Sequence, residues 1–191
     1  MTKINKTNNA EKNTYHHGNL RETLIKAGLN ALKKQDSDDF SLREVARDVG
    51  VSATSVYRHF SDKQAFIEAL CVEGALMLAK LQREVMKANG GGQSGLDATG
   101  FAYVKFALAN PRLFQFMRNE RMKYGDPSGP TMKELFVNVA TLLPEGATPE
   151  QIRIRAFQAW SVVHGVTMLV LEGGMPNDEV LIKEVIKTPT I

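Results

Sequence analysis

Cysteine is nearly absent from this sequence, since Cys71 is the only one among 191 residues. An internal disulfide is therefore excluded, and so is a zinc site built from several cysteines. The sequence also lacks the run of ~18 apolar residues that a membrane-spanning helix needs. Met1–Ala10 has no apolar segment of the kind that marks a signal peptide. We expect a soluble, cytoplasmic protein that needs no membrane, metal or cofactor.

Extremes of composition are missing as well. Hydrophobic residues make up 43% and charged residues 24% of the chain, which is ordinary for a globular protein and excludes disorder throughout. At roughly 100–200 residues per domain, the length allows one large domain or two small ones.

The net charge of +3 is small, but its distribution is uneven. Residues 1–60 hold 10 Lys/Arg and 7 Asp/Glu, whereas the two signs balance over residues 61–191. A basic N-terminal region on a neutral body suggests an anionic partner at that end. Three charges are also within what chance produces, so this signal needs support from motifs.

Apolar residues recur at helical spacing through most of the chain, and no strand pattern is convincing. Start and stop signals predict an all-α protein with helices over about 20–34, 41–49, 52–60, 61–88, 96–109, 112–122, 131–143, 150–171 and 178–186. Capping boxes at Ser41–Glu44, Ser61–Gln64 and Thr148–Gln151 mark three of the starts. The stretches Asn89–Gly95 and Gly125–Pro130 are rich in turn residues and predict loops.

The most informative segment is Leu42–Phe60, where two short helices meet at Gly50. Glycine adopts the left-handed conformation that such a turn requires, and Ala46 is small where the second helix crosses the first. The spacing is that of a helix-turn-helix, whose second helix enters the major groove of DNA. A helical hairpin with a glycine turn and no DNA-binding role is the alternative. The apolar seam comprises Val45, Val49, Val51, Val56 and Phe60.

The second helix of this motif has a predicted outer face. With Val56 and Phe60 inward, the residues facing outward are Ala53, Thr54, Tyr57 and Arg58. Thr54 can exchange a hydrogen bond with a base edge, and Tyr57 can reach phosphate, sugar or base. Phosphate contacts are plausible for Ser52, Ser55, His59 and Lys63, and Arg43 can reach phosphate or a guanine. The alternative for Arg58 and Lys63 is a solvated surface charge.

Residues 15–65 resemble the DNA-binding domain of the TetR (tetracycline-repressor) family of transcriptional regulators. The resemblance is carried by Ser41–Ala46, by Gly50-Val51-Ser52 and, most specifically, by Val56–Phe60 followed by Lys63. It implies a homodimer that reads a palindromic double-stranded DNA operator, together with a helical C-terminal domain that binds a small effector.

Carried over residue by residue, the resemblance implies a role for each position in DNA binding. Base or nearby backbone contacts go to Arg43, Thr54 and Tyr57, and phosphate contacts go to Ser55, His59 and Lys63. Ala53 occupies a base-facing position but has no hydrogen-bonding group, so only apolar readout is expected there.

The C-terminal part resembles one subgroup of the same family, which has a Trp-His-Gly signature. The matching residues are Trp160, His164 and Gly165, together with Asn110–Phe114 and the Tyr15–Leu20 segment before the first helix. A helical core is one explanation for the many aromatic and methionine side chains here. An apolar effector cavity is the other, with candidate residues Phe106, Phe114, Met117, Phe136, Trp160 and His164.

Two questions about this cavity stay open. His164 either hydrogen-bonds an effector or is a buried histidine that holds two helices together. An apolar or aromatic effector suits the cavity because burying an unpaired charge is costly. However, Arg118, Arg121 and Lys123 allow an acidic group at the cavity mouth.

The segment Glu150–Leu171 is apolar on more than one face, so it must be covered on several sides. Packing on its own symmetry mate predicts a two-fold dimer, and an arginine at Val166 or Val170 is expected to disrupt it. The alternative is the central helix of a monomeric bundle.

These patterns predict an arm over 1–14, a DNA-binding domain over 15–62 and a helical effector-binding and dimerisation domain over 63–191. The function expected is that of a dimeric transcriptional regulator, a repressor released from its operator by a small apolar or aromatic effector. The alternatives are a small helical enzyme with His164 as general base and a DNA-binding protein without a regulatory domain.

Overall fold

The chain forms helices throughout the part that the structure describes. A computed structural model describes residues 20–34, 40–124 and 129–187, without the side chains of residues 34 and 120–124. The helices are α1 (Leu20–Lys34), α2 (Leu42–Val49), α3 (Ala53–Tyr57), α4 (Lys63–Ala88), α5 (Gly92–Ala109), α6 (Pro111–Tyr124), α7 (Pro130–Ala140), α8 (Pro149–Leu171) and α9 (Glu179–Ile186). Within these ranges there is no strand, and the all-α prediction is confirmed. The predicted arm 1–14 and Tyr15–Asn19 lie outside the described residues.

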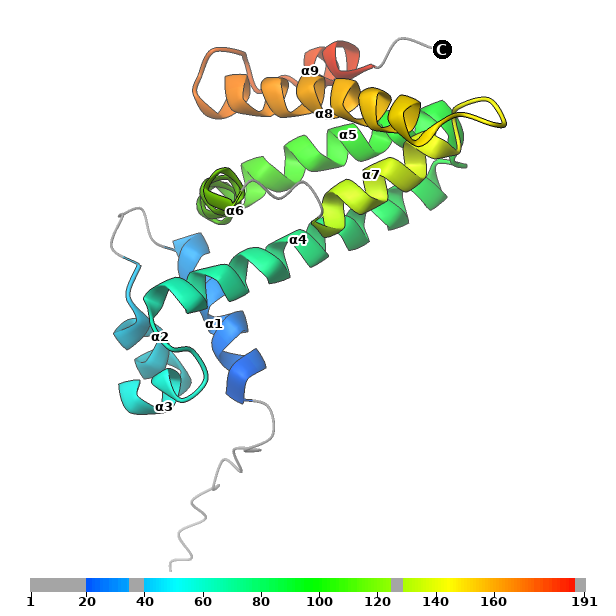
Figure 1. Cartoon of the computed structure of the whole chain (residues 1–191). Coiled ribbons are helices and arrows are strands. Elements are labelled where there is room, and N and C mark those ends of the chain that lie inside the picture. Colours follow the sequence, from blue (N-terminus) through cyan, green and yellow to red (C-terminus); the bar gives the residue numbers. More distant parts are fainter. Residues whose placement is uncertain (1–19, 35–39, 125–128, 188–191) are drawn as a thin grey trace, which may run out of the picture.

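The helices form two groups that share one long helix (Figure 1). α1, α2 and α3 pack together at one end of the molecule. α4 starts beside them and continues along the second group, where α5, α6 and α7 pack against it. α8 and α9 cover the side of α5 that faces away from α4. The arrangement makes α4 the direct mechanical connection between the two groups.

Of the three capping boxes that the sequence predicts, one forms and two do not. Thr148 and Gln151 form the predicted capping box of α8. The cap of α4 is Asp62 instead of Ser61, because the Asp62 carboxylate accepts a hydrogen bond from the Ala65 N–H at 2.7 Å. Ser41 precedes α2 in extended geometry without a side-chain capping bond, so the box predicted there does not form.

The predicted loop Asn89–Gly95 is shorter than expected, because α5 already begins at Gly92. Gly95 lies in the first turn of α5, and its N–H donates to the Gly91 carbonyl at 2.9 Å. A Cβ at Gly95 would lie 2.6 Å from the Met86 sulfur. This glycine therefore allows close packing of α5 on α4 and does not mark a loop.

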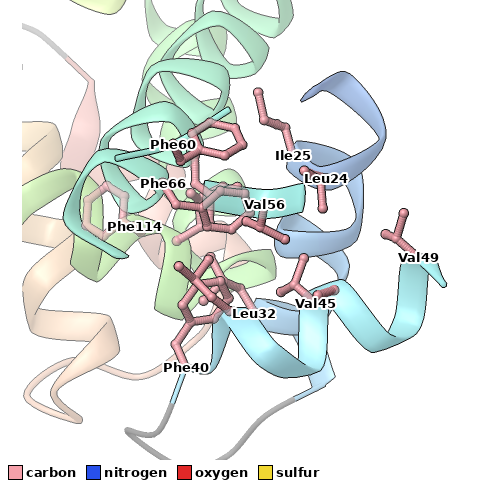
Figure 2. Close-up of a cluster of buried hydrophobic side chains, with 14 of the residues drawn as sticks. Leu24, Ile25, Leu32, Phe40, Val45, Val49, Val56, Phe60, Phe66 and Phe114 are labelled. Carbon is pink, nitrogen blue, oxygen red and sulfur yellow. The ribbon is translucent and has the colours of Figure 1, made fainter. Parts of the chain in front are cut away.

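The largest cluster of buried apolar side chains is continuous between the two groups of helices. It includes Leu24 and Val45 from the N-terminal helices, Phe66 from α4, and Tyr103 and Phe114 from α5 and α6. Figure 2 shows this cluster, with side chains from α1, α2 and α3 pointing toward Phe66. The N-terminal bundle is thus stabilised by apolar surface that the C-terminal helices supply.

By length and composition alone, α8 could cross a membrane. Within the protomer, 28% of its apolar 18-residue segment is buried. The described residues contain no second helix of that kind. One side of α8 packs on α5 and α9, whereas Ile154, Val162 and Leu169 on the other side are exposed. The composition of α8 predicts that several of its faces are covered, and a single protomer covers only some of them.

Close packing of α1 on α4 depends on Gly28. A Cβ at this position would lie 2.8 Å from two ring atoms of Phe66. That ring is held between Phe40, which stacks on it at 5.9 Å, and Phe60, which meets it edge-on at 4.7 Å. Since the ring has no room to move, a methyl group at residue 28 must push the two helices apart.

We therefore expect Gly28→Ala to lower the free energy of unfolding by about 1–3 kcal/mol, the usual cost of overpacking a core. The matched variant is Gly74→Ala, where the nearest atoms are the far ends of two flexible side chains, the Met117 sulfur at 2.9 Å and the Leu113 methyl groups at 3.0 and 3.1 Å. That variant should be close to neutral because alanine also favours the helix. Urea unfolding measures both, and equal losses would show that rigidity of the Phe66 ring is not the cause.

Candidate nucleic-acid interface and effector cavity

Gly50 makes the turn between α2 and α3. Its φ of 75° and ψ of 30° lie in the left-handed region, which other residues adopt only with strain. The N–H groups of Gly50 and Val51 donate to the carbonyls of Arg47 and Ala46 at 3.0 and 2.9 Å. These bonds end α2 and direct the chain into α3, as the sequence predicted for this turn.

α3 is short and is held at both ends. The Ser52 hydroxyl accepts a hydrogen bond from the Ser55 N–H at 3.2 Å and so caps the helix. The helix ends at Tyr57, earlier than predicted, and the following turn is closed by the Phe60 N–H, which donates to the Val56 carbonyl at 3.0 Å. Val56 and Phe60 are buried beneath α3, so its opposite face is turned outward.

The residues proposed for DNA contacts are accessible to solvent in full or in part. Tyr57 is 52% exposed, an unusual degree for a large aromatic side chain. The other exposed members are Arg43, Ser52, Thr54, Arg58, His59 and Lys63, and the half-buried ones are Ala53 and Ser55. The structure thus leaves hydroxyl groups, a phenol and basic side chains accessible on α3 and on the segments next to it in the sequence.

Arg21 is a further basic residue beside this surface that the sequence did not single out. Its guanidinium lies 5.3 Å from the centre of the Phe60 ring, within cation–π distance. No local signal reveals this neighbour, because the contact joins the first turn of α1 to a residue near the start of α4.

Lys63 and the residues around it are held by the cap of α4. The hydrogen bond from the Ala65 N–H lowers the pKa of the Asp62 carboxyl, with a smaller contribution from the Ser61 hydroxyl. Ser61 Oγ donates to the same carboxylate at 3.2 Å. The ionised Asp62 carboxylate therefore fixes the backbone geometry in the first turn of α4, shortly after α3 in the sequence.

A small cavity lies in the C-terminal group where α4, α5, α6 and α8 meet. It measures about 60 Å³ and is lined by Leu78, Tyr103, Phe114, Met117, Arg118, Trp160 and His164. The His164 ring bonds the Tyr103 hydroxyl through Nδ1 at 3.0 Å and packs 5.2 Å from the Trp160 ring, centre to centre. His164 is thus tied to the protein's own core and also forms part of the cavity wall.

A second cavity of about 30 Å³ lies next to the first and shares Tyr103 and Trp160 with it. Its other lining residues are mostly apolar or small, among them Leu96, Gly100, Met132 and Val163. The polar side chains among the lining residues are Gln82, Thr99 and Thr131. Gln82 is 8% exposed, and its Oε1 has no hydrogen-bond partner. An orphaned acceptor is uncommon in a protein interior because its desolvation is not compensated.

Four of the six residues suggested as effector contacts line the first cavity, namely Phe114, Met117, Trp160 and His164. Phe106 and Phe136 line neither of the two cavities. Phe106 belongs to the main core, and the Phe136 ring packs edge-on against Phe157 at 6.3 Å. The rotation of an apolar helix about its own axis decides whether a side chain faces a cavity or the core. The spacing of apolar residues in the sequence does not determine this rotation.

Most of the other lining residues were not among the suggested contacts, and Leu78, Tyr103 and Gln82 are examples. A signal for two of them exists in the sequence, because Leu70, Gly74, Leu78 and Gln82 recur every four residues on α4. Gln82 continues this row, so the sequence itself places a polar side chain on the buried face of α4. Among the described residues there is no group of three or more His, Cys, Asp or Glu side chains that could hold a metal.

The site and the fold together define a helix-turn-helix protein with a separate helical domain that encloses cavities. Two family models match the chain. The model for bacterial regulatory proteins of the tetR family matches residues 24–70, and the tetracycline repressor-like C-terminal domain model matches residues 96–186. The chain therefore belongs to the TetR family of helix-turn-helix transcriptional regulators.

Individual relatives agree with the family. The chain is 34% identical over 101 residues to an uncharacterised HTH-type transcriptional regulator of Haemophilus influenzae. That match spans 52% of this chain and 49% of the relative, so the chain covers about half the relative's length.

Solved structures share the whole fold. A protein of unknown function from Rhodococcus sp. RHA1 is 27% identical, with a TM-score of 0.72 over 92% of this chain and 93% of that one. A TetR family transcription regulator from Marinobacter aquaeolei VT8 is 12% identical, with a TM-score of 0.59 over 87% and 91% of the two chains, which shows the likeness of fold alone.

The Asp62 cap gives a pH-dependent contribution to stability. Because folding lowers the pKa of this carboxyl, the contribution is fully present above the unfolded-state pKa of about 3.9 and is lost as pH falls through the lower folded-state value. Asp62→Asn keeps a capping side chain but cannot titrate. Between about pH 5 and pH 3 the urea midpoint of the variant should fall less than that of the wild type. Parallel curves for the two proteins would contradict this assignment.

Proposed function

We propose that this protein is a dimeric repressor that binds a palindromic DNA operator through α3 and leaves it when a small, mainly apolar effector occupies the C-terminal cavities. The observation that carries the DNA-binding part is the outward face of α3. Exposed Thr54 and Tyr57 stand there on a helix whose other side is anchored by buried Val56. A rigid helix with polar and aromatic groups outward suits the major groove.

The proposed contacts divide by chemistry. Thr54, Tyr57 and Arg43 read bases or the adjacent backbone, with Ala53 limited to apolar contact. The residues that hold phosphates are Ser52, Ser55, Arg58, His59 and Lys63. The Ser52 hydroxyl already caps α3 and shares a hydrogen bond with the Ser55 hydroxyl at 2.9 Å, so a contact to phosphate uses a proton of this hydroxyl pair.

The dimer is formed through the exposed sides of α8 and α9. Large apolar side chains are exposed there, comprising Ile154, Val162, Leu169, Val180, Leu181 and Val185. A second copy of this chain covers that face and gives α8 the cover that a single protomer leaves incomplete. Val166 and Val170 do not belong to the interface, because they are 4% and 9% exposed in the core with Ile182.

Effector binding acts on DNA through α4. This helix carries Leu78 and Gln82 at the cavities, and its first turn holds Lys63 beside the recognition surface. A ligand that displaces the middle of α4 tilts it and changes the spacing of the two recognition helices in the dimer. The Trp160, His164 and Gly165 positions support assignment to the subgroup with the Trp-His-Gly effector domain.

The two proposed domains, 15–62 and 63–191, meet at the cap of α4, and residues 1–14 are proposed as an arm that adds nonspecific attraction to DNA through its lysines. Cytoplasmic location follows from the proposed function, since the operator is in the cytoplasm. The apolar face of α8 is then covered by protein and not by lipid.

The DNA contacts are tested with an operator selected from a random duplex pool by the full-length protein. Lys63→Ala should weaken binding to operator and random DNA alike and reduce the salt slope by about one. Thr54→Ala should cost roughly 1–3 kcal/mol on the operator and little on random DNA. The control is Lys80→Ala, an exposed lysine on the outer side of α4. If no operator emerges, or if Thr54→Ala weakens both DNAs equally, the assignment is wrong.

The dimer is tested at the exposed face of α8. Leu169→Arg, at a side chain that is 49% exposed in the protomer, should give a folded monomer with much weaker operator binding. Val72→Arg is the matched control, because Val72 is 58% exposed on α4, away from α8 and α9. Light scattering at micromolar concentration measures the mass. A monomeric wild type, or a Leu169→Arg protein that stays dimeric, would show that this face is not the interface.

A further inference from the structure

Each of the two cavities has a polar side chain that protein groups satisfy poorly, Arg118 in one and Gln82 in the other. We infer that the two cavities are the halves of one site for a single-ring aromatic carboxylic acid. The carboxylate binds Arg118, the ring lies between Phe114 and Trp160, and a polar substituent at the far end of the ring bonds Gln82. This inference rests on the proposed function and names the chemical class of its effector.

Arg118 supplies the first end. Its side chain is half-buried and lines the larger cavity beside the His164–Tyr103 pair. The hydrogen bond that the structure records for its guanidinium goes from Nη1 to the Met168 sulfur at 3.6 Å, and a thioether is a weak acceptor. None of the ion pairs among the described residues includes Arg118. A guanidinium in such surroundings favours a carboxylate, which it binds with two parallel hydrogen bonds.

Gln82 supplies the second end. The amide is more than nine-tenths buried, and its Oε1 has no hydrogen-bond partner. Two of the hydroxyls that line the same cavity bond elsewhere: that of Thr99 donates to the Leu96 carbonyl at 2.7 Å, and that of Tyr103 bonds His164 Nδ1 at 3.0 Å. A ligand hydroxyl that donates to Gln82 Oε1 therefore removes the cost of an unpaired buried acceptor.

The spacing of the two cavities along α4 limits the size of the ligand. Leu78 lines the cavity that contains Arg118, Gln82 lines the other, and these two residues are one helical turn apart on α4. One helical turn is about 5.4 Å, which is close to the span of a benzene ring with substituents at opposite positions. A longer chain or a fused ring system exceeds that span.

The wall between the cavities is made of groups that can move to admit a ring. Trp160 and Tyr103 line both cavities. The cavities measure about 30 and 60 Å³, whereas one ordered water needs roughly 10–15 Å³. A ring enters by turning the Trp160 side chain and by shifting Met117, whose thioether is flexible. Met117 also lies against Gly74 of α4, so the same shift reaches the helix that leads to the DNA-binding surface.

The test measures binding to the full-length protein without DNA, by thermal shift and calorimetry. The probes are benzoate, phenylacetate and 4-hydroxyphenylacetate, each beside the matching primary amide, which has the same shape and no charge. At least one acid should bind with a Kd below 1 mM and raise Tm, and its amide should bind at least 10-fold more weakly. Failure of all three acids, or equal binding of acids and amides, overturns the inference.

Two variants locate the ends of the ligand. Arg118→Gln should weaken binding of the acid by roughly 10–100-fold, and Arg118→Lys should restore part of it because the charge returns. Arg153→Gln, at an exposed arginine paired with Glu150, is the control and should bind normally. Gln82→Leu should remove the advantage of 4-hydroxyphenylacetate over phenylacetate and leave phenylacetate binding unchanged. Undiminished acid binding by a folded Arg118→Gln protein overturns the anion site.

Operator binding in the absence of any probe separates this inference from the proposed function. If wild-type protein fails to bind DNA but binds the acid through Arg118, the regulatory proposal fails and the ligand site stands. If it binds operator normally and ignores every acid, the regulator stands and the ligand class is wrong.

Discussion

Burial of Phe66 is the interaction on which the rest of this structure depends. The ring is fully buried, with Phe40 stacked on it, Phe60 edge-on to it and the backbone of α1 against it at Gly28. A bundle as small as α1–α3 buries little apolar surface by itself. By placing Phe66 on α4, the chain makes the stability of the DNA-binding helices depend on the helix that also carries the cavity wall.

That shared core has a consequence for regulation. Phe114 belongs to the same buried cluster and also lines the cavity with His164, while the neighbouring Phe116 meets Phe40 edge-on at 6.2 Å. A displacement of α6 or α4 near the cavity therefore acts on side chains that pack directly on α2 and α1. Close-packed interiors transmit such displacements because they have little free space to absorb them.

The cavities combine two demands that usually conflict. Their walls must be apolar enough for the core to fold, and they must carry polar groups that distinguish one ligand from another. Here the polar atoms are placed at the edges of the aromatic wall: His164 is bonded to Tyr103, Arg118 contacts a thioether, and Gln82 has a free acceptor. The first of these pairs is satisfied within the protein, whereas the guanidinium of Arg118 meets a weak acceptor and the Oε1 of Gln82 has no hydrogen-bond partner.

The sequence by itself determined the local structure: the Gly50 turn, the caps at Ser52 and Thr148, and the burial of Val56 and Phe60. These features depend on a few neighbouring residues, so a short motif specifies them. Only the tertiary structure decided that Val166 and Val170 face the protomer core while Leu169 is exposed, that Phe106 lies in the core, and that Gln82 reaches a cavity. On a helix that is apolar all round, such as α8, the spacing of apolar residues leaves the rotation undetermined. The packing of α5, α7 and α9 against α8 sets it.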